Sequence, residues 1–250
     1  MNGSRSRPTR VHVLSVAAQL AIALASAVPS LLHAQASPGM SRLDAGSFTL
    51  FVAGGRTGQE QFSMQSVEGA DGTVLELRAE SSMGERRGVV RLSTDSAGSP
   101  LAYAVEERTG SVVSLRLSGQ RVRGRFATLA RSTRGEAARE YLLAPGAIVL
   151  EDEGVHQYAM LLRPHRPAVG DTLLIPTLTP VGSRQGVMRL VLESTRDTVT
   201  VAGTAQEAWR WNATPTPGDQ RTIWADPTGR VLRLRIPAQR LEAIRDDVPR

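Results

Sequence analysis

The chain has 250 residues, no cysteine, and 30 basic side chains, all of them arginine, against 24 acidic ones. The absence of cysteine excludes disulfides, thiolate metal sites and a lipid-modified cysteine. Three arginines lie in the first 36 residues, so residues 37–250 hold 27 arginines against 24 acids, a net charge of about +3. This small surplus, with only 4% aromatic residues, argues against a nucleic-acid-binding protein.

The first 36 residues have the plan of a secretory signal peptide. Residues 1–10 carry arginines and no acid, residues 11–27 form an apolar run, and residues 34–36 are Ala-Gln-Ala, a small-x-small site. We therefore expect cleavage after Ala36 and a periplasmic or secreted protein that is soluble once the signal is removed. A retained membrane anchor is the less favoured interpretation, because the apolar run is short for a membrane span.

Residues 37–150 show the pattern of an antiparallel β-meander. Phe48, Leu50 and Val52 alternate onto one face of a first strand, and a Gly-rich turn at residues 54–58 leads into a second. Turn signals then recur about every 8 to 12 residues, which is typical of all-β proteins. The expected strands are residues 46–53, 59–64, 73–80, 89–94, 101–106, 111–117 and 121–128, followed by two short strands within 141–150.

Three arginines alternate along the expected strand 121–128. Arg121, Arg123 and Arg125 would share one face, where guanidinium groups suit a phosphate, an acidic headgroup or a polysaccharide. A solvated sheet face explains the same alternation and is the favoured interpretation. The three residues are therefore a candidate anion patch and no more.

The clearest helical pattern lies at residues 152–163, between two strand-rich halves. Four apolar residues recur at i, i+3, i+4 and i+7 and so share one stripe of a helix: Val155, Tyr158, Ala159 and Leu162. The acids at 151–153 are expected to cap this helix at its N-terminus, and Pro164 to end it. We expect one central amphipathic helix that covers the sheet, over either a filled core or a ligand cavity.

The chain beyond the helix returns to strands, expected at residues 171–177, 185–193, 198–202, 205–212, 221–226 and 230–236. A short terminal helix is expected at 237–245, with Leu241 and Ile244 facing inward. Trp209 and Trp211 share one strand face and either fill the core or line an apolar cavity. Residues 37–250 are thus expected to form a single β-rich domain, with two half-sheets (46–150 and 171–236) joined around helix 152–163 as an alternative organisation.

Catalytic motifs are missing from the sequence. No Gly-x-Ser-x-Gly elbow is present, and His156 and His165 are the only histidines of residues 37–250. Their spacing of nine, with Pro164 between them, fits no metal-binding pair on a helix. We expect His156 to be a partly exposed helix residue, and we predict no catalytic residue, no cofactor site and no metal site.

Two hairpin patterns carry a resemblance to known proteins. The stretch Ile223-Trp-Ala-Asp226-Pro-Thr-Gly229-Arg-Val-Leu-Arg233 resembles the strand-Asp-x-x-Gly-strand hairpin of the DUF3108-like exported bacterial proteins and, more distantly, the LolA/RseB-type half-barrels. A Gly-x-x-x-Gly-x-Glu-x-Phe pattern is similar to the opening hairpin of the former: Gly54, Gly58, Glu60 and Phe62. The resemblance implies a strongly curved antiparallel sheet, a half-barrel or β-roll, that can hold an acyl chain or another apolar ligand.

The leading hypothesis is an exported, non-catalytic envelope protein that binds a lipid or another apolar ligand. Its candidate lining is Val155, Tyr158, Ala159, Leu162, Trp209 and Trp211. One alternative is a structural or protein-interaction module that docks on an envelope protein through a sheet edge or the arginine face. The least favoured alternative is a glycan-active enzyme that uses carboxylates and Trp209, because no recognised motif supports it.

Overall fold

The structure, a computed structural model, describes residues 39–69 and 72–249. The predicted signal peptide, residues 1–36, lies outside the described residues. In the described part, fifteen strands form one sheet, accompanied by one short α-helix and one 3-10 turn. No helix within these residues is long and apolar enough to cross a membrane. The prediction of a mainly β, curved antiparallel meander is therefore confirmed.

The first run of strands is a meander in which each strand pairs antiparallel with the next. It comprises β1 (Met40–Val52), β2 (Gly55–Gly69), β3 (Gly72–Met83), β4 (Arg86–Asp95), β5 (Pro100–Thr109), β6 (Val112–Val122), β7 (Arg125–Ser132) and β8 (Gly135–Leu142). The turns between strands are short, so strands that are neighbours in sequence are also neighbours in the sheet.

The second run begins after a short connection and returns to the start of the first. It comprises β9 (Ile148–Val149), α1 (Gln157–Leu162), β10 (Thr172–Thr179), β11 (Arg184–Val201), β12 (Thr204–Thr216), β13 (Arg221–Ala225), β14 (Val231–Ile236), the 3-10 turn η1 (Pro237–Gln239) and β15 (Leu241–Arg245). Only the pairing of β9 with β10 is parallel.

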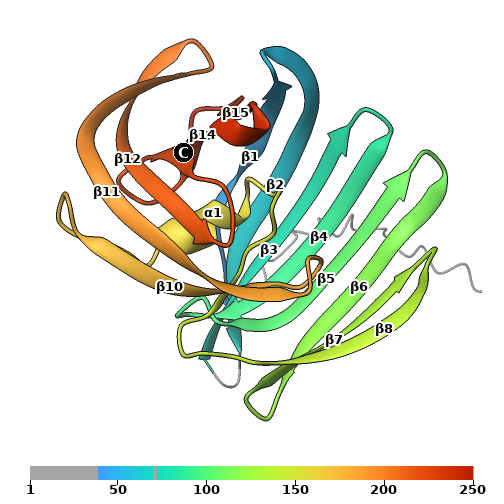
Figure 1. Cartoon of the computed structure of the whole chain (residues 1–250). Helices are drawn as coiled ribbons and strands as arrows, with labels where there is room; N and C mark the ends of the chain where they lie inside the picture. Colours follow the sequence, from blue (N-terminus) through green and yellow to red (C-terminus); the bar gives the residue numbers. More distant parts are fainter. Residues whose placement is uncertain (1–38, 70–71, 250) are drawn as a thin grey trace, which may run out of the picture. The chain divides into compact units, whose positions relative to one another are not determined.

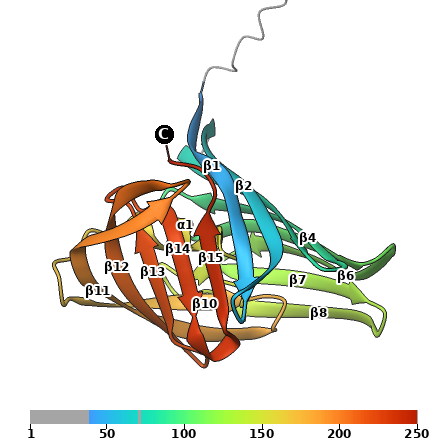
Figure 2. The same cartoon turned by 90° about the horizontal axis from the view of Figure 1, so that it is seen from above.

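The two runs are joined in the middle of the sheet. The strand order is β8-β7-β6-β5-β4-β3-β2-β1-β15-β14-β13-β12-β11-β10-β9, so the first and last strands lie side by side and β8 and β9 are the edges. Figures 1 and 2 show the second run curled around α1, which lies on the inner side of the curved sheet. The sheet is open, because no pairing joins β8 to β9 within the described residues.

Alternation along the strands decides which face is inner. On β3, Leu77 and Ala79 are buried whereas Glu76, Arg78 and Glu80 are exposed. Successive side chains of a strand point to opposite faces, so this period of two creates an apolar inner face and a charged outer face.

The predicted covering helix at 152–163 is wrong. Only residues 157–162 are helical, and all six are buried. The sequence pattern assumed an amphipathic helix with one exposed side, but α1 is enclosed by the curl and needs no polar face. A single turn and a half is also too short to be stable by itself, so packing rather than helical propensity holds it in place.

The predicted terminal helix at 237–245 is also wrong. The chain makes one 3-10 turn at Pro237–Gln239, takes a left-handed conformation at Arg240 (φ 49°), and enters β15. Leu241 and Ala243 are buried on alternate positions of this strand. β15 fills the gap between β1 and β14, and backbone pairing on both sides outweighs the local helical tendency.

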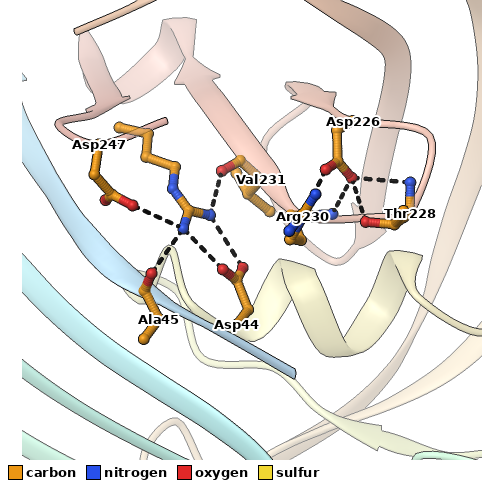
Figure 3. A network of polar contacts seen from close by, with 8 residues as sticks. Asp44, Ala45, Asp226, Thr228, Arg230, Val231 and Asp247 are labelled. Atoms are coloured by element: carbon orange, nitrogen blue, oxygen red, sulfur yellow. Dashed lines mark hydrogen bonds and ion pairs between the residues drawn. The ribbon is translucent and has the colours of Figure 1, made fainter. Parts of the chain in front are cut away.

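A buried ion pair fastens the joint between the two runs. The guanidinium of Arg245 on β15 donates to both carboxylate oxygens of Asp44 on β1, at 2.8 and 3.0 Å. It also donates to the Ala45 carbonyl at 2.8 Å and to Asp247 at 3.2 Å, and Figure 3 shows these groups converging on it. Arg245 is 1% exposed and Asp44 6%. The sheet joint is therefore closed by a bidentate charged contact with no access to water.

Two hairpins use the same aspartate turn. Asp95 accepts the N–H groups two and four residues ahead (Ala97 and Ser99), and Asp226 does the same for Thr228 and Arg230 (Figure 3). In both turns a glycine with φ near 88° precedes the next strand. Residues 95–101 and 226–232 therefore share the same Asx-type turn, in which the aspartate side chain accepts backbone N–H groups of the turn.

Candidate functional site

A cavity of about 270 Å³ lies between the inner face of the first run and the segment that leads into α1. Strands β1 to β5 form its floor, residues 151–157 its roof, and the β10–β11 turn one side. The lining is Leu50, Glu60, Ser81, Met83, Arg86, Arg87, Gly88, Val90, Tyr103, Val105, Glu107, Glu151, Asp152, Glu153, Gly154, His156, Gln157, Val181 and Gly182. The inner end is built from buried residues, whereas the rim residues are exposed, so the cavity opens at one side.

Two small residues make the space. The strand register places Glu60, Ser81, Gly88 and Glu107 in one row across β2 to β5. The centre of that row is only a hydroxymethyl group and a hydrogen atom, and a Cβ added to Gly88 would lie 2.8 Å from Oγ of Ser81. The depression in the floor therefore follows from residue size at two adjacent positions.

The roof is pinned to the floor by Glu60. Its carboxylate accepts the backbone N–H of Val155 at 3.2 Å and that of His156 at 2.7 Å. Glu60 is 2% exposed, so both bonds are made away from water, where a charged acceptor binds N–H groups strongly. A side chain of β2 thus supplies the capping that the acids at 151–153 were expected to supply.

The amide of Gln157 shapes the roof from within. Its oxygen accepts the Glu151 N–H at 2.6 Å, and its nitrogen donates to the carbonyls of Glu151 (2.6 Å) and Gly154 (2.8 Å). Gly154 leaves the room for this amide, because a Cβ there would lie 2.9 Å from the Gln157 nitrogen. The loop is therefore a defined turn and not an extension of the helix.

His156 is buried, contrary to the expectation of a partly exposed helix residue. It is 5% exposed, and its Nδ1 lies 3.0 Å from Oε1 of Glu60. That oxygen already accepts the backbone N–H of the same residue, and Nδ1 does not meet the geometry of a hydrogen bond. The imidazole is thus held beside a carboxylate at the inner end of the cavity.

Tyr103 and Glu151 bring two further titratable groups to the cavity. The Tyr103 hydroxyl has no hydrogen-bond partner in the described structure, although the residue is 3% exposed. Burial, followed by the charge of Glu151, raises the pKa of Tyr103 well above its usual value. Burial also raises the pKa of Glu151 to about 7, against the opposing effect of the Val181 N–H that its Oε1 accepts at 2.9 Å. A neutral acid and a carboxylate are therefore both accessible to Glu151 near neutral pH.

The other two acids of the roof form ion pairs. Asp152 pairs with Arg184 of β11 and lies 3.6 Å from Arg221 of β13. Glu153 pairs with Arg86 of β4 at 3.2 Å. These acids tie the roof to both runs of the sheet, and the prediction that they cap a helix is wrong.

Nothing in the cavity forms a nucleophile–base pair. Ser81 supplies the aliphatic hydroxyl of the lining, and among the described residues no hydrogen bond links it to His156. Within the same residues, no three histidine or carboxylate side chains gather in a way that could hold a metal ion.

The six residues predicted to line an apolar ligand site lie elsewhere. Val155, Tyr158, Ala159, Leu162 and Trp211 are fully or almost fully buried in the main hydrophobic core, and Trp209 packs against it with its ring centroid 6.5 Å from that of Trp211. None of the six lines the 270 Å³ cavity. The Tyr158 hydroxyl accepts from Arg221, whose guanidinium also lies 5.7 Å from the ring centroid. The apolar stripe of the helix is used for packing.

The three arginines of the candidate anion patch do not share a strand face. Arg121 is on β6 and pairs with Asp95 at 3.1 Å. Arg123 has a φ of 49° in the β6–β7 turn, and Arg125 is the first residue of β7. The expected strand 121–128 is wrong because Arg123-Gly124 forms a two-residue hairpin turn, and positive φ at both positions is the signature of such turns.

The residues that line the cavity had weak sequence signals. Glu60 was visible only as the acid of the Gly-x-x-x-Gly-x-Glu-x-Phe pattern, and it occupies an inner-facing position between Gly58 and Phe62. An acid on the apolar face of a strand requires a buried partner, and this is the signal that could have identified it. Tyr103 carried no comparable signal, because a tyrosine fits a sheet core without further function.

No family model matches the chain, and no curated protein matches it. The chain is similar to a solved structure, described as the β-barrel-like protein of domain of unknown function DUF1849 from Brucella abortus. The two are 10% identical, with a TM-score of 0.48, over 84% of this chain and 96% of that chain. The match is to neither the DUF3108-like nor the LolA/RseB-type proteins.

Proposed function

We propose that the protein is an exported, non-catalytic binding protein of the cell envelope, and that it holds a lipid or another apolar ligand in the cavity beneath residues 151–157. The observation that carries the proposal is the cavity itself, whose lining combines apolar side chains with a buried Tyr103 hydroxyl that has no hydrogen-bond partner in the described structure. Binding sites are typically concave and mostly apolar, with a few polar groups that orient the ligand.

The size of the cavity limits the ligand. Ligand pockets are commonly about 300–1,000 Å³, and 270 Å³ lies just below that range. The cavity suits a small molecule or the end of one apolar chain, with the remainder leaving through the exposed rim. Leu50, Met83, Val90 and Val105 would contact the apolar part.

The test begins with the contents of the protein recovered from the envelope fraction. Organic extraction and mass spectrometry should release a ligand, and the intact mass should correspond to a chain that begins after Ala36. A fluorescent apolar probe should bind the emptied protein in competition with that ligand.

A matched pair of variants locates the probe. Ser81→Leu fills the floor of the cavity and should weaken probe binding at least tenfold, since a buried leucine occupies the space of several ligand atoms. Ser82→Leu adds the same side chain at the next position, which faces the other side of the sheet, and should leave binding unchanged. If no lipid is extracted and the probe does not bind, the proposed function is wrong. If both variants bind the probe as well as the parent, the cavity is not the site.

A further inference from the structure

Two carboxylates and a phenolic oxygen of the cavity lining can accept hydrogen bonds from a ligand. The Glu107 carboxylate has no hydrogen bond or ion pair in the described part of the chain, and the Glu151 carboxylate accepts the Val181 N–H through Oε1. Both carboxylates act electrostatically on the Tyr103 hydroxyl, which has no partner although it is buried. All three groups line the same cavity, and Tyr103 and Glu107 occupy inner-facing positions of β5.

The positive charges of the lining are used elsewhere or lie at the rim. Arg86 pairs with Glu153. Arg87 has no ion-pair partner among the described residues, but it is exposed on the rim. No guanidinium of the lining therefore pairs with Glu107 or Glu151; Arg184 of β11, which pairs with Asp152, acts on Glu151 through its charge.

From this geometry we infer that the ligand carries a protonated amine on its apolar body, and that the ammonium group binds between Glu151, Glu107 and the Tyr103 hydroxyl. The inference rests on the proposed function, and it names the chemical class of the ligand. An ammonium group has three N–H donors and no acceptor, which suits a lining that offers two carboxylates and a phenolic oxygen. A carboxylate ligand would meet repulsion from two acids at the same place.

The charge state of Glu151 makes the binding depend on pH. The groups that face it are Tyr103 from β5, the Val181 N–H from the β10–β11 turn, Asp152 from its own segment and Arg184 from β11. Burial keeps the pKa of Glu151 at about 7, so the carboxylate that binds the cation forms between about pH 6 and pH 8. A bound ammonium stabilises the charged form and lowers this pKa, so amine affinity rises with pH across that window.

The experiment compares three probes that share one chain: octylamine, octanol and octanoic acid. Isothermal titration calorimetry of the full protein at pH 8 should show octylamine binding tightest, and lowering the pH to 6 should weaken it about tenfold. The amine stays protonated over this range, so the change reports on the protein. Octanol affinity should stay constant with pH.

Two isosteric variants assign the effect. Glu151→Gln removes the carboxylate and should reduce octylamine affinity about tenfold at pH 8 and abolish its pH dependence, since a charged hydrogen bond is replaced by a neutral one. Glu80→Gln changes an exposed acid of β3 that pairs with Arg78 and does not line the cavity, and it should leave affinity within about twofold. Thermal unfolding curves of both variants confirm that they fold.

The outcomes separate the two proposals. If octanol and octanoic acid bind as tightly as the amine, and Glu151→Gln has no effect, the inference is overturned while the binding cavity stands. If none of the three probes binds the parent protein, the proposed function fails as well. The parent protein could instead prefer octanoic acid, and Arg87→Gln could lose this preference. That result would place the headgroup at Arg87 on the rim, and it would likewise overturn the inference.

Discussion

The buried ion pair at the sheet joint makes a quantitative prediction for stability. Replacing Arg245 with methionine keeps a long apolar side chain against Phe62, whose ring centroid lies 5.3 Å from the guanidinium. It leaves Asp44, only 6% exposed, as a buried carboxylate without its two charged hydrogen bonds. Removing one partner of such a pair costs about 3–5 kcal/mol in free energy of unfolding.

The expected change is large enough to measure by heat or by denaturant. For a domain of this size, about 1 kcal/mol shifts the melting temperature by about 2–4 °C, so Arg245→Met should lower Tm by about 6–20 °C. Arg78→Met is the control, because Arg78 pairs with Glu80 on the exposed face, where both side chains are more than half exposed. This variant should lose less than about 1 kcal/mol.

A double variant decides whether the cost comes from the orphaned charge. Asp44→Leu combined with Arg245→Met replaces both charges by apolar groups, and it should unfold within about 2 kcal/mol of the parent despite the loss of donors to the Ala45 and Val231 carbonyls. Urea unfolding by linear extrapolation gives the three free energies. A double variant that loses as much stability as Arg245→Met, or an Arg245→Met variant as stable as the parent, would refute the reasoning.

Two further predictions concern one turn, the β13–β14 hairpin. Gly229→Ala should lower the free energy of unfolding by about 2 kcal/mol or more, because Gly229 has a φ of 88° and a Cβ there would lie 2.9 Å from Cα of Arg163. Gly124 also has a positive φ but open space around it, so Gly124→Ala should lose only about 1 kcal/mol in urea unfolding. Equal losses in the two variants would contradict a role for the contact with Arg163. Burial alone would raise the pKa of Asp226, but hydrogen bonds from the turn lower it overall, so Asp226 stabilises the fold above its unfolded pKa near 4, and this contribution is lost as pH falls through the folded pKa. Asp226→Asn should therefore cost about 1–3 kcal/mol at pH 7 and less at pH 2. A cost in urea unfolding that does not change with pH would contradict this prediction.

The strand content was predictable because a period of two is a local property. Phe48 and Leu50 on β1, and Leu77 on β3, alternate with polar residues, and these alternations matched the buried face of the sheet. Hairpin turns that contain Asp and Gly were equally predictable from the sequence, as residues 95–98 and 226–229 show. Strand ends were less predictable, since β11 continues for 18 residues across a stretch that suggested a turn between two strands.

The two predicted helices failed for a physical reason that no local pattern contains. Residues 241–245 have a spacing compatible with a helix, but β1 and β14 leave a place for one strand between them. Residues 152–156 have the acids expected at a helix N-terminus, but those acids find arginines on distant strands. Long-range pairing decided the conformation in both segments.

The candidate site could not be predicted as a site, because its parts come from separate segments. The apolar stripe of the predicted helix points to Val155 and Leu162, which are buried in the main hydrophobic core and do not line the cavity. The cavity instead occurs where side chains are small, at Ser81 and Gly88, and where a buried hydroxyl is left unpaired, at Tyr103. Neither feature can be recognised from the sequence, because only the strand register places the small side chains next to each other and the hydroxyl away from a partner.

The first hairpin connects the stability of the sheet to the geometry of the site. Asp44 and Glu60 are the two acids that are buried in the described residues, and they lie on β1 and β2. One binds Arg245 of the last strand, and the other binds the backbone of residues 155–156. Each acid holds the second run of the chain against the first, at the joint in one case and at the cavity roof in the other. Burial of a charge is costly unless it is paired, so both acids depend on these contacts, and Glu60, in keeping its contacts, also fixes the roof of the cavity.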